Sequence, residues 1–96
     1  MRRWWHDLWS TGTAAEQVPP LLTAALALGL PACDVGNAQD MIEQAEWQLA
    51  FDIVVMQLFE YAIPITADFY EQVETGAESM AIAPEAYSFL LLLVKK

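Results

Sequence analysis

The residues of this sequence with the greatest capacity for chemistry are carboxylates, and several recur at helical spacing. Glu71, Glu74 and Glu78 follow an i, i+3, i+7 pattern, which places them on one ridge of a helix. Helical bundles hold two metal ions with such carboxylates when Glu-x-x-His motifs add ligands, and the single histidine, His6, is far away in sequence. Calcium-loop spacing is missing as well. The pattern predicts no metal site and no cofactor, and it favours an acidic recognition surface.

Residues for nucleophilic or acid–base catalysis are scarce. The sequence has no Ser-His-Asp arrangement, no glycine-rich phosphate loop, and no Lys or Arg between residues 3 and 95. Cys33 is the only cysteine, so an internal disulfide is excluded, and the one histidine is too remote in sequence to act as its base. We expect a protein without catalytic activity.

Charge is distributed unevenly along the chain. Thirteen Asp and Glu against four Lys and Arg give a formal net charge of −9 at pH 7. All four basic residues are at the ends, namely Arg2, Arg3, Lys95 and Lys96. The carboxylates between them repel one another, and a basic partner would relieve this repulsion. Direct nucleic-acid binding is disfavoured because there is no basic surface to displace counterions from phosphates. The expected partner is a basic protein.

The elements that must position these carboxylates are helices, because apolar residues recur with a helical period and no convincing strand pattern is found. We expect helices from about Pro19 to residue 28, over 35–44 with Asp34 as N-cap, over 47–62, from residue 67 after Thr66 as N-cap, and from Pro84 to the C-terminal lysines. The third is apolar almost all round, so it should be surrounded by the others. The predicted fold class is all-α, a small four- to five-helix bundle.

The chain length of 96 residues allows one domain. Residues 1–17 are interpreted as a Trp-rich N-terminal tail and residues 18–96 as a single helical domain. Trp4, Trp5 and Trp9 could form a short amphipathic turn in that tail. The apolar share of 56% exceeds the roughly 45–50% that is usual, so we expect an exposed apolar patch, which commonly marks a partner site.

Two further hypotheses concern membranes and self-association. An apolar run over residues 21–30 precedes Cys33 in a faint lipoprotein-like box, but it spans ten residues where a bilayer needs about 20. Asp7, Glu16 and two prolines also interrupt a signal helix. We expect no membrane span and a cytoplasmic location. A lipid-anchored or membrane-surface protein and a small structural homodimer stay open as alternatives.

The aromatic residues divide into two sets. Phenylalanine and tryptophan inside the expected helices are interpreted as core residues, namely Trp47, Phe51, Phe59 and Phe69. Three tyrosines could be core residues or interface anchors, namely Tyr61, Tyr70 and Tyr87.

From residue 26 to residue 94 the chain resembles the MafI-type immunity proteins of bacterial polymorphic toxin and contact-dependent inhibition systems. The segments that carry the resemblance are ALALGLP at 25–31, EWQLAFDIVVMQLFEYAIPI at 46–65 and ADFYEQVETGAESMAIAPEAYSFLLLLV at 67–94. The pattern L-x-E-Y-x-I-P-I over residues 58–65 is the most specific of them.

The resemblance implies an immunity protein that binds and neutralises a cognate toxin in the cytoplasm. Such toxins are often nucleases, whose basic surface would suit an acidic partner. Our hypothesis is that carboxylates of the two helices expected at 47–62 and after 66 cover that surface. The candidate toxin-binding residues are Asp52, Glu60, Asp68, Glu71, Glu74 and Glu78, with Tyr61 and Tyr70 as anchors.

Overall fold

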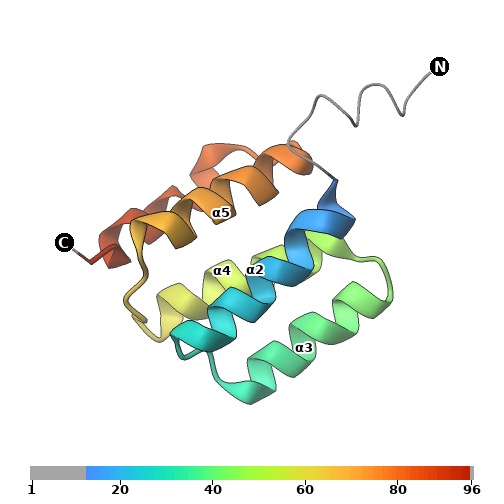
Figure 1. Cartoon of the computed structure of the whole chain (residues 1–96), viewed down its shortest axis with the longest axis horizontal. Coiled ribbons are helices and arrows are strands. Elements are labelled where there is room, and N and C mark those ends of the chain that lie inside the picture. The colour runs from blue at the N-terminus through green and yellow to red at the C-terminus, as the bar shows by residue number, and fades with distance from the viewer. Residues whose placement is uncertain (1–12, 96) are drawn as a thin grey trace.

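Four α-helices that run in alternating directions build the body of the protein (Figure 1). The computed structural model describes residues 13–95. The helices are α2 (Ala14–Leu28), α3 (Ala32–Glu43), α4 (Trp47–Glu60) and α5 (Ala67–Ser79), followed by the 3-10 helices η1 (Pro84–Ala86) and η2 (Ser88–Leu93). Over these residues β-structure is limited to one isolated bridge, between Ile65 and Val94. The predicted all-α bundle is confirmed. The predicted amphipathic turn at Trp4, Trp5 and Trp9 lies outside the described residues.

Helix α2 begins earlier than predicted. Thr13 occupies the N-cap, and its amide donates to the Glu16 carboxylate at 3.1 Å, which is half of the capping box that the sequence Thr-Ala-Ala-Glu specifies. The predicted start at Pro19 was wrong: Pro19 and Pro20 lie inside the helix, and residues 14–17, expected in the tail, belong to it. Two prolines remove two helical amides, and α2 offsets that loss by burying Val18, Leu21, Leu22 and Ala25.

Helix α3 also begins before its predicted start, and this changes the role of Asp34. Pro31 stands at the N-cap position, and Asp34 is the third helical residue, with only 7% of its surface exposed. The predicted N-cap at Asp34 was therefore wrong. Its carboxylate still lies in the first turn, where the helix dipole favours negative charge. Asp34 and Ala38 are the residues that α3 buries.

All four α-helices end in the same left-handed turn. Gly29 takes it after α2 with φ 119°, but alanines take it elsewhere: Ala45 (φ 59°), Ala62 (φ 52°) and Ala81 (φ 55°). The amide that follows each left-handed residue donates to a carbonyl five residues back, as in Ile63 N to Leu58 O at 3.0 Å. Ala62 therefore follows α4 and does not belong to it, which corrects the predicted end. A left-handed alanine costs about 1 kcal/mol.

The predicted fifth α-helix was wrong, because the chain after Pro84 forms short 3-10 turns. Tyr87, with φ −142° and ψ −11°, separates η1 from η2. The chain then returns to the start of α5, where Ile65 N donates to Leu93 O and Lys95 N donates to Ile65 O, both at 2.9 Å. These two bonds tie the C-terminal segment to the α4–α5 junction.

Helix α2 lies at the centre of the packing, because it contacts α5, α3 and α4. In Figure 1 it lies between α5 and α3. The core runs through Phe51 of α4, which is fully buried and meets Tyr87 edge-to-face at 6.3 Å. Gly76 of α5 is adjacent to the same ring, since a Cβ built there would lie 3.8 Å from it. Phe51 therefore links α4 to α5, the two helices that carry most of the candidate site residues.

Candidate functional site

The structure distributes the predicted toxin-binding residues over two helices with different neighbours. Helix α5 packs mainly against α2, whereas α4 packs against α3, α2 and η2. The carboxylates on α5, named here the α5 ridge, are Asp68, Glu71, Glu74 and Glu78. On α4 and directly after it are Asp52, Glu60 and Tyr61, all exposed.

The α5 ridge is a solvated acidic stripe on a well-anchored helix. Thr66 is its N-cap, as predicted, and accepts a hydrogen bond from the amide of Phe69 at 3.0 Å. Three ridge carboxylates are exposed and Glu74 is half-buried. The helix beneath buries Phe69, which was predicted as a core residue, and also Tyr70, Val73, Gly76 and Ala77.

Two of the three tyrosines are core residues. Tyr70 is 9% exposed and Tyr87 5% exposed, and their ring centroids lie 6.0 Å apart. Burial raises the pKa of both phenols, and the negative charge of Glu74 raises it further. Tyr70 thus presents little surface to a partner, whereas Tyr61 is 48% exposed.

The outer face of α4 is apolar and open, so the prediction that other helices surround α4 was wrong. Leu49, Met56 and Phe59 on this face expose 49%, 53% and 40% of their surface. The prediction that Phe59 is a core residue was wrong. Its ring is partly exposed and lies 4.9 Å from the ring of Phe89, measured between centroids. Asp52 and Glu60 are on the same face. The exposed apolar patch that composition predicted is found here.

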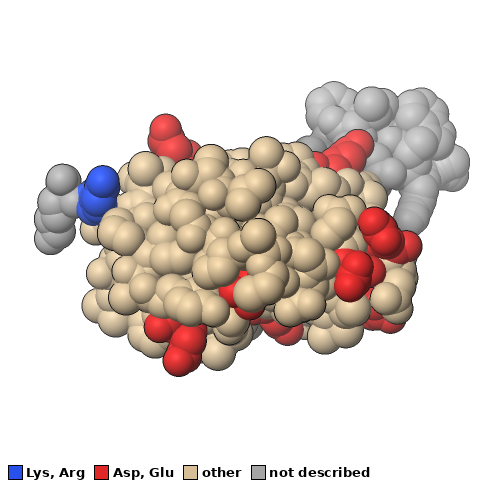
Figure 2. Space-filling view, turned by 90° about the horizontal axis from the view of Figure 1, so that it is seen from below, with Lys and Arg blue, Asp and Glu red and all other residues tan. Residues whose placement is uncertain are grey.

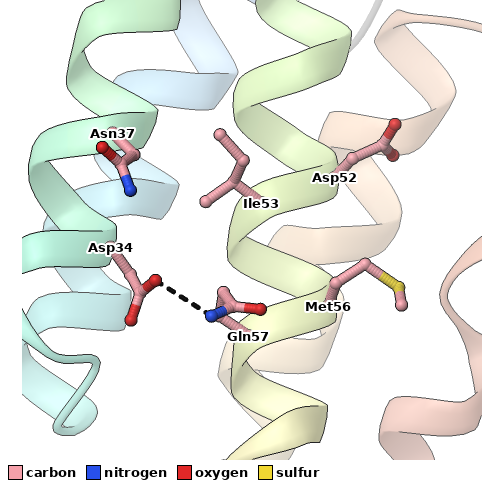
Figure 3. A pocket seen from close by; sticks show the side chains of 6 residues that line it. All are labelled: Asp34, Asn37, Asp52, Ile53, Met56 and Gln57. Carbon is pink, nitrogen blue, oxygen red and sulfur yellow. Dashed lines mark hydrogen bonds between the residues drawn. The ribbon is translucent and has the colours of Figure 1, made fainter.

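A groove of about 330 Å³ adjoins this face, between α3 and α4 (Figure 3). We name it the α3–α4 groove. Helix α3 contributes Asp34 and Asn37, and α4 contributes Asp52, Ile53, Met56 and Gln57. Apolar atoms provide most of its lining. Asp34 and Ile53 point into the space between the two helices, whereas Asp52 and Met56 point from α4 away from α3 (Figure 3).

Asp34 is a buried carboxylate held by neutral donors. Gln57 donates from Nε2 to Oδ1 at 2.9 Å (Figure 3). A hydrogen bond with Asp34, together with its negative charge, raises the pKa of the Tyr61 phenol one turn beyond Gln57. Burying a charge in this way is unfavourable unless donors compensate it. The sequence contained a usable signal, since Gln57 and Tyr61 stand at i and i+4 on a very apolar helix.

Asp52 lies at the rim of the groove, beside Ile53 and Met56. Its side chain is exposed, yet partial desolvation raises its pKa above the ordinary range for aspartate. A carboxylate in this state gains more from a cation placed on it than a fully hydrated one would.

Electrostatically, the described surface is one-sided. Every carboxylate of the sequence except Asp7 lies within residues 13–95, and Lys95 is the only Lys or Arg there. On the face shown in Figure 2, acidic groups are scattered over a largely uncharged surface and cationic atoms occur only at one end.

No three His, Cys, Asp or Glu side chains between residues 13 and 95 come together to hold a metal ion. None of the helices there combines the length and the apolar character that crossing a bilayer requires.

Comparison with known proteins gives no matching family model, no matching curated protein and no matching solved structure. Functional inference therefore rests on the residues and on their arrangement.

Proposed function

We propose that this chain is a non-catalytic helical binding protein that neutralises a basic protein, in the manner of an immunity protein acting on a toxin. The observation that carries the proposal is the uncompensated charge of the described body, where Lys95 alone opposes the carboxylates. A partner with clustered Lys and Arg would relieve the self-repulsion and would be steered to this surface.

Exposed apolar side chains beside the carboxylates support the proposal that this acidic surface binds a partner. Leu49, Met56 and Phe59 lie beside Asp52 and Glu60 on one face of α4. Apolar contacts supply affinity when they are desolvated, while the surrounding charges select the partner and accelerate its approach. A nuclease domain is the class of toxin that fits best, because an enzyme that binds phosphates presents basic residues. Inhibition would follow from covering that surface in the cytoplasm.

A membrane-surface protein is the second candidate, and one observation favours it. Leu91 and Leu92 of η2 expose 56% and 80% of their surface, close in sequence to Lys95. Apolar side chains next to cations are typical of interfacial anchors. Sedimentation of the purified chain with anionic phospholipid vesicles separates the candidates: co-sedimentation that L92S abolishes would support membrane contact.

The proposed function is tested by capturing the partner from the host. We expect the tagged full chain to recover one basic protein in near-equimolar amount, identified by mass spectrometry, and to inhibit the activity of that protein once both are purified. Recovery of the chain alone, as a monomer or self-associated, would contradict the proposal. Recovery of a basic protein whose activity the chain does not inhibit would support binding of a basic partner but refute its neutralisation.

A further inference from the structure

The outer face of α4 and the adjoining α3–α4 groove form one continuous surface that lacks a partner within the described chain. Asp52 and Met56 belong to both features. Ile53, half-buried, forms the wall between them. Monomeric proteins seldom leave several large apolar side chains exposed together, and such patches usually mark interaction sites.

The shape of the groove favours a protein segment over a small molecule. Its volume of about 330 Å³ is at the lower end of the roughly 300–1,000 Å³ common for small-molecule sites, and it is more open than enclosed. A site of this kind buries one or two side chains of a segment laid across it. Met56 suits the purpose, because an unbranched thioether adapts its shape to an incoming side chain.

Charge excludes two of the other occupants. A second copy docked face to face would bring Asp52 and Glu60 close to their own equivalents, and like charges across an interface are strongly unfavourable. An anionic lipid surface would be repelled by the same carboxylates, since the only described cation, Lys95, lies on the C-terminal segment beyond η2. A cationic segment with an apolar stripe meets neither obstacle.

We propose that the α3–α4 groove and the outer face of α4 bind a basic amphipathic helix of the partner protein. An apolar side chain of that helix seats between Ile53 and Met56, and a guanidinium pairs with Asp52 at the rim. Asp34, a buried residue in the lining of the groove, adds attraction that water screens poorly. This inference rests on the proposed function, because it specifies where the basic partner docks.

A synthetic peptide tests the surface without knowledge of the natural partner. The probe is an amphipathic helix of the same length as α4, with leucine on one face and arginine on the other, labelled for fluorescence anisotropy. Two control peptides replace all leucines by serine or all arginines by glutamate. We expect the full chain to bind the first peptide and to bind both controls at least roughly tenfold more weakly.

Matched variants of the protein locate the binding site. The double variant D52N/M56S removes one carboxylate and one exposed apolar side chain from the groove. E85Q/L92S makes the equivalent changes on η1 and η2, where both residues are exposed. We expect D52N/M56S to raise the Kd of the probe roughly tenfold or more, and E85Q/L92S to change it by less than about twofold. Because all four positions are exposed, helix content by circular dichroism should stay unchanged.

Several results would overturn the inference, and they differ in what they mean for the proposed function. Equal loss in both variants, or a larger loss in E85Q/L92S, would refute binding at the groove, while the proposal of an acidic binding protein would stand. Failure of the unaltered chain to bind the peptide would count against both. A dimer in light scattering that M56S dissociates would assign the face to self-association. Vesicle binding that M56S abolishes would assign it to lipid.

Discussion

The two halves of the molecule, α5 on one side and the α3–α4 pair on the other, differ in how well the helices that carry their negative charge are packed. Helix α5 buries five residues, and hydrogen bonds from Ile65 and Lys95 fasten its N-terminal end to the C-terminal segment. Helix α3 buries only Asp34 and Ala38, and its neighbour α4 leaves Leu49, Met56 and Phe59 open to solvent. On α5, the charged side chains lie on a helix whose apolar side chains are buried. On the α3–α4 pair, charged side chains lie beside apolar side chains that are exposed to solvent.

This difference indicates two roles for the carboxylates. Solvated charges on the α5 ridge act at a distance, so they should govern how fast a basic partner arrives and how salt affects its arrival. Asp52, partly desolvated beside Met56, is placed for contact, so it should govern how slowly the partner leaves.

The largest contrast between buried and open apolar surface is expected at two phenylalanines of α4. Phe51 is fully buried where the halves meet, so F51A should lower the free energy of unfolding by about 3–5 kcal/mol. Phe59 is 40% exposed and keeps one aromatic neighbour, so F59A should cost only about 1 kcal/mol. Urea denaturation measures both. If F51A fails to fold, F51L gives the milder comparison, and equal losses at the two positions would contradict the description of α4 as half-open.

The buried carboxylate of the groove half provides the next contrast. Q57L removes the amide that donates to Asp34 at 2.9 Å, and it should cost about 1–3 kcal/mol because the charge loses its main donor. In a D34N background the same change should cost less, since no buried charge remains. Q72L on α5 is the matched control: Gln72 is exposed, and its replacement should change stability by under about 0.5 kcal/mol. Equal losses of stability from Q57L in both backgrounds would show that the Gln57 amide does not stabilise the carboxylate of Asp34.

Alkaline pH should destabilise the protein through the two buried tyrosines that pack beside each other, Tyr70 and Tyr87. Burial raises the pKa of Tyr70 and Tyr87 above that of an unfolded tyrosine. Groups with a raised folded-state pKa contribute stability that is complete below the unfolded pKa, about 10, and is lost as pH rises through the folded value. Thermal unfolding between pH 8 and 11 should show this loss, and Y87F should reduce it. A pH dependence that Y87F leaves unchanged would contradict the assignment.

The smallest expected effects are at the helix ends, where helices of both halves end in the same type of left-handed turn. A62G after α4 and A81G after α5 should each stabilise the protein by about 0.5–1 kcal/mol, because glycine takes a left-handed conformation without strain. G29A makes the reverse change at φ 119° and should destabilise it. Differential scanning calorimetry of the three variants measures these shifts. A loss of stability in A62G or A81G would show that the alanine methyl contributes packing there.

The sequence predicts well what depends on local chemistry. Thr66 as N-cap and Gly29 as the end of α2 follow from side-chain and backbone preferences, and the apolar period indicates the bundle. Left-handed turns at Ala45, Ala62 and Ala81 could not be foreseen, because the amino acid present disfavours them and long-range packing decides. The capping box at Thr13 was a readable signal, obscured by the two prolines that follow.

The candidate site could be predicted only in part. The acidic ridge of α5 follows from spacing, and its exposure agrees with that pattern. The groove depends on the contact between α3 and α4, which brings Asp34 opposite Gln57, 23 residues away in sequence. Periodicity gave every apolar face of α4 the same weight, so it could not distinguish the face against the core from the face that stays open.

The central claim is neutralisation of a basic protein, and titration of the activity of the captured partner with the purified chain tests it most directly. We predict complete inhibition at an equimolar ratio, with D52N/M56S requiring a large excess and E85Q/L92S behaving as the unaltered chain does. Activity that persists at a large excess of the unaltered chain would contradict the claim.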